Sequence, residues 1–323
     1  MDKPKVIVTR SWPEAVEATL REDFDVVLNK SDRAMTSEEL HQAMQTADAV
    51  LPTVTDKIDA DVFNGGSTRA KILANFGVGY SHIDINAAKE YGVTVTNTPD
   101  VLSGCTADLA ITLMLMVARR VGEGLRQIKS DTWNGWSPTH MMGTRISGKT
   151  LGIIGFGRIG QEVAKRAHHG FDMKIIAYNR SPIPEARLAT CNATAIDSID
   201  ALLAQADFIS LHCPGGKDNR YLIDARRLNL MKPTAYLINT ARGEVVDENA
   251  LSQALSFETI AGAGLDVYER EPRVPSALVG CDNAVLLPHL GSATRETREA
   301  MGFSVIKNLK SFFSGVTPTD LVA

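Results

Sequence analysis

A glycine-rich turn between an apolar run and a helical pattern limits the fold of this chain more than any other feature. The segment TLGIIGFGRIGQEVAKRA has glycines at positions 155, 157 and 160, directly after the apolar residues LGII. In a βαβ unit, this spacing allows a tight turn, close approach of a pyrophosphate, and packing of the helix on the strand. The phosphates then bind free N–H groups at the start of the helix. The context favours a dinucleotide-binding turn over a purely structural one, with Gly155, Gly157, Arg158, Ile159 and Gly160 as cofactor-binding residues.

Apolar runs typical of buried parallel strands alternate with amphipathic helical segments in two series. The first series predicts strands at 6–9, 25–28, 48–51, 71–75 and 93–97, and the second at 150–155, 174–178, 207–213, 235–239, 261–267 and 284–288. Such alternation is typical of α/β folds whose parallel sheets are covered on both faces. A chain of 323 residues is also long for one simple core. We therefore expect two doubly wound parallel-sheet domains.

Two long helical stretches predict how the domains are connected. One begins near Ser103 and leads away from the first series of strands, and the other covers 295–313 after the last strand. Because the last helix has no strand partner ahead of it, we expect it to return to the first domain, which would then be discontinuous. The predicted boundaries are residues 1–98 plus 291–323 for the first domain and 99–290 for the nucleotide-binding domain.

Composition and charge exclude several classes of protein. The net charge is −4, with 34 basic and 38 acidic residues, so nucleic acid and anionic membranes are not expected partners. The most apolar segment, 109–118, has about half of the roughly 20 residues that a membrane span needs and indicates a buried helix. The N-terminus goes directly into a strand pattern without a signal peptide. Four scattered cysteines without a CxxC pair favour reduced thiols, no metal site and a cytoplasmic protein.

The strand that follows the glycine-turn helix ends in an unusual way. In NAD-binding folds this strand normally ends in Asp or Glu, which binds the ribose hydroxyls. Here the segment KIIAYNRSP has Asn179, Arg180 and Ser181 at that point. A 2′-phosphate needs donors instead of an acceptor, and a guanidinium can bind it with two hydrogen bonds. The pattern favours NADP, with NADPH preferred over NADH, although a solvated loop remains the alternative reading.

Polar residues follow three later strands, at the edge where ligands bind in open α/β sheets. INTARGEVVD has Arg242, GLDVYEREP has Asp266 and Glu271, and LLPHLGSAT has His289. A lone histidine after a strand is more often structural than catalytic. An arginine, an acid and a histidine converging on one sheet edge favour a catalytic site.

Six motifs, in order along nearly the whole chain, carry a family resemblance. They are NFGVGYSHID (75–84), NTPDVLSGCTADLA (97–110), GIIGFGRIG, NTARG, LDVYEREP and PHLGSAT. The chain resembles the D-isomer-specific 2-hydroxyacid dehydrogenases, and within them most the glyoxylate/hydroxypyruvate reductases. The resemblance implies NADPH-dependent reduction of small 2-oxo acids. It also implies a flavodoxin-like substrate domain and a Rossmann nucleotide-binding domain, with the active site in the cleft between them.

The resemblance also implies roles for single residues. Arg242 would bind the substrate carboxylate, His289 would be the acid/base with Glu271 as its partner, and Asp266 would lie near the nicotinamide. The chemistry agrees with these roles, because histidine is the natural proton donor near neutral pH and arginine can both bind a carboxylate and polarise a carbonyl. The NRS ending argues against the phosphoglycerate and formate dehydrogenases of the same family, which mostly carry an acid there. The remaining cofactor-binding residues that we expect are Thr106, Cys213, Pro214, Thr240, Ala241, His289 and Gly291.

The first domain is expected to supply further substrate contacts. In NFGVGYSHID, Gly77 and Gly79 would allow a turn whose amides hold a carboxylate, so Val78 and Gly79 are predicted to bind the substrate. Ordinary turn glycines are the alternative. Phe76 and Tyr80 could narrow the site toward small substrates or belong to the core.

A segment with two tryptophans, WNGWSPTHMMG (133–143), lies between the long helix and the glycine-turn strand. The resemblance implies that it embraces a partner subunit in a homodimer and that Trp136 reaches the partner's active site. Ordinary core packing of Trp136 is the alternative.

Two classes of function remain open. One is the reductase, for which D-lactate, 2-ketogluconate or branched 2-oxo acid chemistry are alternatives to glyoxylate and hydroxypyruvate. The other is a nucleotide-sensing scaffold of the corepressor type with the same fold. A scaffold is expected to have a partner-binding extension, whereas this sequence ends a few residues after its last helix.

Overall fold

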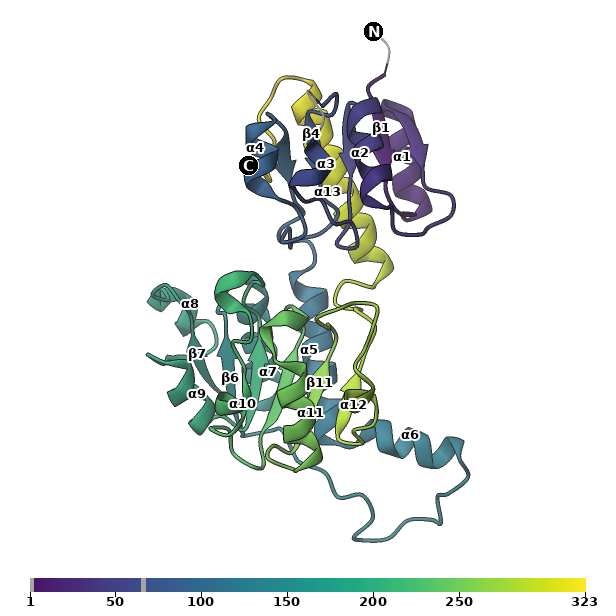
Figure 1. Cartoon of the computed structure of the whole chain (residues 1–323). Helices are drawn as coiled ribbons and strands as arrows, with labels where there is room; N and C mark the ends of the chain where they lie inside the picture. Colours follow the sequence, from purple (N-terminus) through teal and green to yellow (C-terminus); the bar gives the residue numbers. More distant parts are fainter. Residues whose placement is uncertain (1–2, 65–67) are drawn as a thin grey trace. The chain divides into compact units, whose positions relative to one another are not determined.

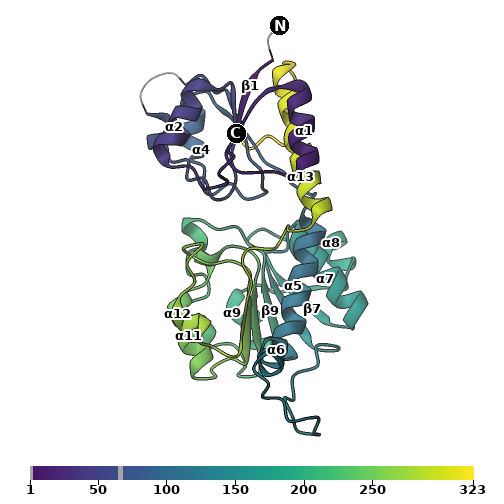
Figure 2. The ribbon, with the colours of Figure 1, turned by 90° about the vertical axis from the view of Figure 1, so that its right-hand side faces the viewer.

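The computed structural model describes residues 3–64 and 68–323 and divides into two compact units. Unit 1 consists of Met1–Leu102 with Ser292–Ala323, and unit 2 is Ser103–Gly291 (Figures 1 and 2). The predicted boundaries at 98/99 and 290/291 lie four residues and one residue before these. Both units contain only parallel strand pairs between their named strands, which confirms the predicted α/β class.

Unit 1 is built on a five-stranded sheet in the order β2-β1-β3-β4-β5. This order is the flavodoxin-like one, in which ligands bind beyond the carboxyl ends of the strands. The chain's last helix, α13, packs on α1 and against β4, so two distant parts of the sequence form one core (Figure 2). The strands are β1 Lys5–Val8, β2 Asp25–Leu28, β3 Ala49–Leu51, β4 Ile72–Ala74 and β5 Thr94–Thr96. The helices are α1 Glu14–Asp23, α2 Ser37–Thr46, α3 Ala60–Phe63, α4 Ile85–Glu90 and α13 Arg295–Phe313.

Unit 2 is built on a seven-stranded sheet in the order β12-β11-β10-β9-β6-β7-β8. Its strands are β6 Thr150–Ile154, β7 Lys174–Tyr178, β8 Thr194–Ala195, β9 Phe208–Leu211, β10 Tyr236–Asn239, β11 Gly262–Leu265 and β12 Ala284–Leu286. Its α-helices are α5 Ser103–Ala118, α6 Val121–Lys129, α7 Arg158–Phe171, α8 Glu185–Ala189, α9 Ile199–Gln205, α10 Ala225–Leu228, α11 Glu248–Ser256 and α12 Ser276–Val279. Short 3₁₀ turns cover Lys217–Asn219 and Gly243–Val245.

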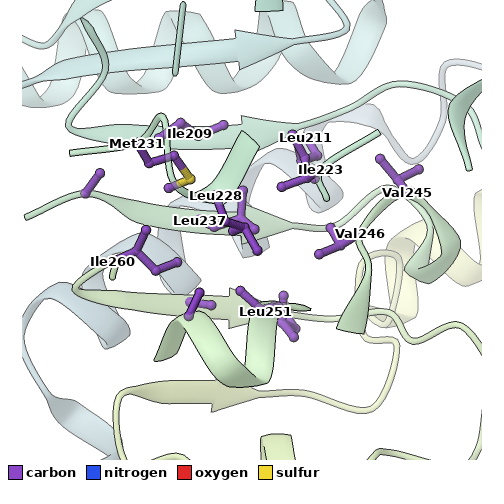
Figure 3. Packing of buried hydrophobic residues seen from close by; sticks show 14 of the residues in the cluster. Ile209, Leu211, Ile223, Leu228, Met231, Leu237, Val245, Val246, Leu251 and Ile260 are labelled. Carbon is purple, nitrogen blue, oxygen red and sulfur yellow. The ribbon is translucent and has the colours of Figure 1, made fainter. Parts of the chain in front are cut away.

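The sheet of unit 2 has a hydrophobic core on each face. One core joins β9, β10 and β11 to the helices α9 to α12, and Figure 3 shows its side chains, among them Ile209, Leu237 and Leu251. The other core joins the opposite face to α5 and α7. With both faces covered, the strands are apolar on both sides, which explains the uninterrupted runs in the sequence.

Helix α5 belongs to the core of unit 2. Its side chains from Ala110 to Ala118 are largely buried, which confirms the buried helix predicted for 109–118. Within residues 3–64 and 68–323, no helix combines the length and apolar character needed to cross a membrane.

Candidate active site

The glycine turn connects β6 to α7 as the sequence predicts. Gly155 has a positive φ of 96°, and a Cβ there would lie 2.5 Å from the backbone nitrogen of Cys213. A Cβ on Gly160 would overlap the carbonyl oxygen of Gly155. Gly157, by contrast, would meet nothing within 4 Å, and as the N-cap of α7 it makes no side-chain cap. Packing therefore requires the first and last glycines, whereas the middle one leaves open space at a helix N-terminus, which fits a pyrophosphate.

The segment after β7 lies beside this turn. Asn179 Oδ1 accepts a hydrogen bond from Phe156 N at 3.3 Å, while its Nδ2 donates to the backbone oxygen and Oγ of Ser181, both at 3.0 Å. Arg180 Nη1 lies 3.6 Å from Asp218 Oδ2, with both side chains about four-fifths exposed. Such an exposed ion pair contributes little stability. Arg180 can therefore exchange Asp218 for another anion at small cost.

Arg242 follows β10 and precedes the 3₁₀ turn at Gly243–Val245. The side chain of Asn239 holds the loop between β10 and this turn, since it accepts from Ala241 N at 3.0 Å and donates to Arg242 O at 2.9 Å. Arg242 Nη1 donates to the carbonyl oxygen of Ala241 at 2.6 Å. Burial lowers the pKa of the Arg242 guanidinium, and the charges of Glu271 and Glu244 oppose this shift. The guanidinium is thus a desolvated cation suited to binding a carboxylate.

His289 and Glu271, which the sequence analysis pairs as acid/base and partner, form a hydrogen bond. The distance from His289 Nδ1 to Glu271 Oε2 is 2.8 Å, and the two side chains are 31% and 32% exposed. Glu271 Oε1 accepts from Tyr268 N at 3.1 Å. A carboxylate on Nδ1 orients the imidazole and leaves Nε2 as the nitrogen available to a substrate.

Glu271 remains ionised in this pair. Burial alone would raise the pKa of the Glu271 carboxyl, but the hydrogen bond and charge of His289, the Tyr268 N–H and the charge of Arg242 together hold it below its ordinary value. Because the folded-state pKa is lowered, this carboxylate stabilises the fold at neutral pH. That stabilisation is lost as the pH falls through the lowered pKa.

Asp266, which we expected near the nicotinamide, uses both carboxylate oxygens to hold the turn at His289. Oδ1 accepts from Leu290 N at 2.6 Å and Oδ2 from Gly291 N at 2.8 Å, and the Asp266 backbone oxygen accepts from His289 N at 2.9 Å. Thr106 Oγ1 donates to Gly291 O at 3.0 Å. His289 itself has a positive φ of 56°, a conformation that costs a non-glycine residue about 1–3 kcal/mol and needs such support. The sequence indicated the site but not this positioning role.

Other residues predicted to bind cofactor lie at the same edge of the sheet of unit 2. Cys213 and Pro214 follow β9 next to Gly155, and burial raises the pKa of the Cys213 thiol to about 11, which keeps the thiol protonated. Thr240 follows β10, and its Oγ1 is buried without a hydrogen-bond partner in the described part of the chain. A buried polar atom without a partner fits a position that binds a polar ligand.

In unit 1 the loop at Gly77–Gly79 is held by asparagine side chains. Neither glycine has a positive φ. Asn75 Nδ2 donates to the carbonyl oxygens of Gly77 and Gly79, both at 3.0 Å, and Asn97 Nδ2 donates to that of Val78 at 2.8 Å. The carbonyls are thereby held by asparagines. The predicted binding of substrate by Val78 and Gly79 remains a prediction.

Three aromatic residues with open assignments have different environments. Phe76 is 5% exposed and its ring centroid lies 4.6 Å from that of Trp12, so it belongs to the core of unit 1. Tyr80 is 41% exposed. Trp136 is 83% exposed, which argues against core packing within its own chain.

The parallel sheet of unit 2, its glycine turn and the polar residues at the same edge are the features of a dinucleotide-binding α/β domain. A family model, "D-isomer specific 2-hydroxyacid dehydrogenase, NAD binding domain", matches residues 111–291. The chain belongs to the D-isomer specific 2-hydroxyacid dehydrogenase family.

Within residues 3–64 and 68–323, no group of three or more His, Cys, Asp or Glu side chains is arranged for a metal ion.

Relatives with similar sequence and structure cover essentially the whole chain. A glyoxylate reductase from Thermococcus litoralis is 46% identical over 99% of this chain and 97% of its own. The crystal structure of a glyoxylate reductase from Paecilomyes thermophila has a TM-score of 0.88 at 31% identity, covering 100% of this chain and 99% of its own. An NADPH-dependent glyoxylate/hydroxypyruvate reductase from Sinorhizobium meliloti, solved with NADP and malonate, has a TM-score of 0.88 at 34% identity, covering 100% and 97%. These findings support a 2-hydroxyacid oxidoreductase.

Proposed function

We propose that the protein reduces glyoxylate to glycolate and hydroxypyruvate to D-glycerate, with NADPH as the preferred cofactor. The observation that carries this proposal is the 2.8 Å contact between His289 and Glu271 in the same unit as Arg242 and the glycine turn. Supporting it, glyoxylate reductases are among the relatives that match this chain over nearly its full length.

Each residue of the site has a separate task in this reaction. The bound nicotinamide would supply the hydride. The imidazolium of His289 donates its proton from Nε2 to the carbonyl oxygen of the 2-oxo acid, and the Glu271 carboxylate stabilises the charged imidazole before transfer. Arg242 binds the substrate carboxylate and polarises the carbonyl, which lowers the barrier to hydride addition.

The proposal is tested with a panel of 2-oxo acids assayed with NADPH and with NADH. The panel contains glyoxylate, hydroxypyruvate, pyruvate, 2-ketogluconate and a branched 2-oxo acid. We expect the highest kcat/KM for glyoxylate and hydroxypyruvate. A higher value for any of the other acids would assign the protein to another substrate within the family. No turnover of any acid with either cofactor would favour the scaffold.

Cofactor preference is expected to depend on Arg180. Replacing Arg180 by alanine should weaken NADPH and leave NADH almost unchanged, because only NADPH has a phosphate to lose. A hydrogen bond to a charged group contributes roughly 1.5–3 kcal/mol. That range corresponds to roughly 10- to 150-fold in affinity. The measurement is kcat/KM for both cofactors in the wild type and the variant.

Two further variants sharpen this test. Asn179→Asp keeps an acceptor for Phe156 N but loses the two donors to Ser181, and its carboxylate repels a 2′-phosphate. It should therefore shift preference toward NADH further than Arg180→Ala does. Arg187→Ala removes an exposed arginine from the neighbouring helix α8 and is the matched control, with no expected change. Equal use of both cofactors by the wild type, or an equal loss for both in Arg180→Ala, would mean that this segment is only a loop.

We also propose that the protein is a homodimer in which Trp136 acts across the interface. Helix α6 has no buried residue, and Leu125, Ile128, Trp136 and Met142 are between 52% and 83% exposed. Large apolar side chains gathered in one exposed segment mark an interaction surface, and most oligomers have two-fold symmetry. This exposed apolar surface supports the proposal that the partner is a second copy of the chain.

Replacing Trp136 by alanine is expected to raise the KM for the 2-oxo acid, because the side chain would no longer reach the partner's site. Sedimentation should show a dimer for the wild type. Phe257→Ala is the matched control, since Phe257 is 81% exposed in the same unit but lies outside this segment. A monomeric wild type, or an unchanged KM in Trp136→Ala, would refute the proposal.

A further inference from the structure

The side chain of Tyr268 is buried below the loop that carries His289. It is 7% exposed and packs in the core formed with α9 to α12. Its hydroxyl donates to the carbonyl oxygen of Leu287 at 3.0 Å and lies 3.5 Å from that of Leu265. Leu287 N in turn donates to Leu265 O at 2.8 Å. The hydroxyl is therefore bound where the chain leaves β12, two residues before His289.

The backbone of Tyr268 contacts the loops of the two other site residues. Its N–H donates to Glu271 Oε1 at 3.1 Å. A Cβ on Gly243, the residue after Arg242, would overlap the carbonyl carbon of Tyr268, so the two backbones lie in direct contact. The segments that carry Arg242, Glu271 and His289 thus all meet at one residue.

We propose that Tyr268 is a positioning residue for the reaction, whose hydroxyl fixes the His289 loop relative to Glu271. This inference rests on the proposed function, because it takes His289 as the proton donor. The proton must be donated at one nitrogen of His289, and a displacement of about 1 Å can cost up to roughly 100-fold in rate. Burial raises the pKa of the Tyr268 phenol, so the hydroxyl keeps its proton and remains a donor at neutral pH.

Tyr268→Phe is the direct test, because phenylalanine keeps the ring in the core and removes only the hydroxyl. Tyr236→Phe is the matched control. Tyr236 is also 7% exposed in unit 2, and its hydroxyl lies 2.9 Å from Thr144 Oγ1, a residue outside the site. Both variants lose one hydrogen bond of a buried tyrosine and should show similar shifts in Tm.

Only Tyr268→Phe is expected to lose turnover. We expect kcat for glyoxylate to fall by about tenfold. This is less than the roughly 100-fold that a displacement of about 1 Å can cost, because the loop keeps its other hydrogen bonds. The KM for NADPH should not change, since the glycine turn is untouched. Tyr236→Phe should keep the kcat of the wild type. A purely structural role for Tyr268 would instead lower the Tm of both variants without this difference in kcat.

His289→Ala, measured in parallel, separates failure of this inference from failure of the proposed function. If the wild type does not reduce glyoxylate, or if His289→Ala keeps its kcat, the proposed function is wrong. If the wild type is active and His289→Ala is not, wild-type kcat in Tyr268→Phe overturns only the role of Tyr268. The role of Tyr268 would also be overturned if the loss of kcat in Tyr268→Phe were fully explained by a smaller fraction of folded protein.

Discussion

Replacing His289 by alanine is expected to lower kcat for 2-oxo acid reduction by roughly 10²–10⁴-fold, the usual contribution of a general acid. The variant loses both the proton donor and the partner of Glu271, which lies 2.8 Å away. Binding of NADPH should be largely intact, because the glycine turn lies after a different strand of the sheet. Steady-state kinetics together with a cofactor titration measure both effects.

Control variants make the result for His289 specific. His169→Ala removes an exposed histidine near the end of α7 and should leave kcat unchanged. Glu271→Gln should reduce kcat less than His289→Ala, because the amide oxygen can still accept from Nδ1 but no longer carries a charge. Turnover close to that of the wild type in His289→Ala would exclude it as the acid/base.

Replacing Arg242 by alanine is expected to raise the KM for the 2-oxo acid and to lower kcat by about 10²–10³-fold, the range seen when one donor to a developing oxyanion is removed. Both parameters should change because the guanidinium binds the carboxylate in the ground state and polarises the carbonyl in the transition state. The same kinetic assay, run across a wide range of glyoxylate concentrations, separates KM from kcat.

Two variants control the result for Arg242. Arg242→Lys keeps the charge but not the planar pair of donors, so we expect it to recover only part of the activity. Arg226→Ala removes an exposed arginine paired with Asp200 in the same unit and should behave as the wild type. An unchanged KM in Arg242→Ala would rule out Arg242 as the carboxylate-binding residue.

Much of the fold follows from patterns that are local in the sequence. Strands buried on both faces are mostly apolar, and therefore the runs at β9 and β11 could be recognised without knowledge of their neighbours. The two-residue strand β8 is exposed and has no such run, and it was not predicted. Helix α6 was also missed, although its apolar residues Val121, Leu125 and Ile128 are spaced as on one face of a helix.

In the candidate site, too, some features follow from local sequence patterns and others do not. The residue types Arg242, Glu271 and His289 could be selected because each follows a predicted strand, and parallel strands bring their carboxyl ends to one edge. For Gly77 and Gly79 the sequence did not show that Asn75 holds their loop through its hydrogen bonds to carbonyl oxygens. No local pattern distinguishes an asparagine that does this from one exposed to solvent.

The α/β class, the glycine turn and the residues suited to the chemistry could all be predicted from the amino acids alone, because they depend on residue type and on the position of each residue after a strand. The groups that support these residues could be identified only in the folded chain. Asp266 holds Leu290 and Gly291 across 24 and 25 positions in the chain, and Tyr268 holds Leu287 across 19. A hydrogen bond requires its two atoms to lie about 3 Å apart in a defined orientation. For residues this far apart in the chain, that proximity results from the packing of whole strands and helices.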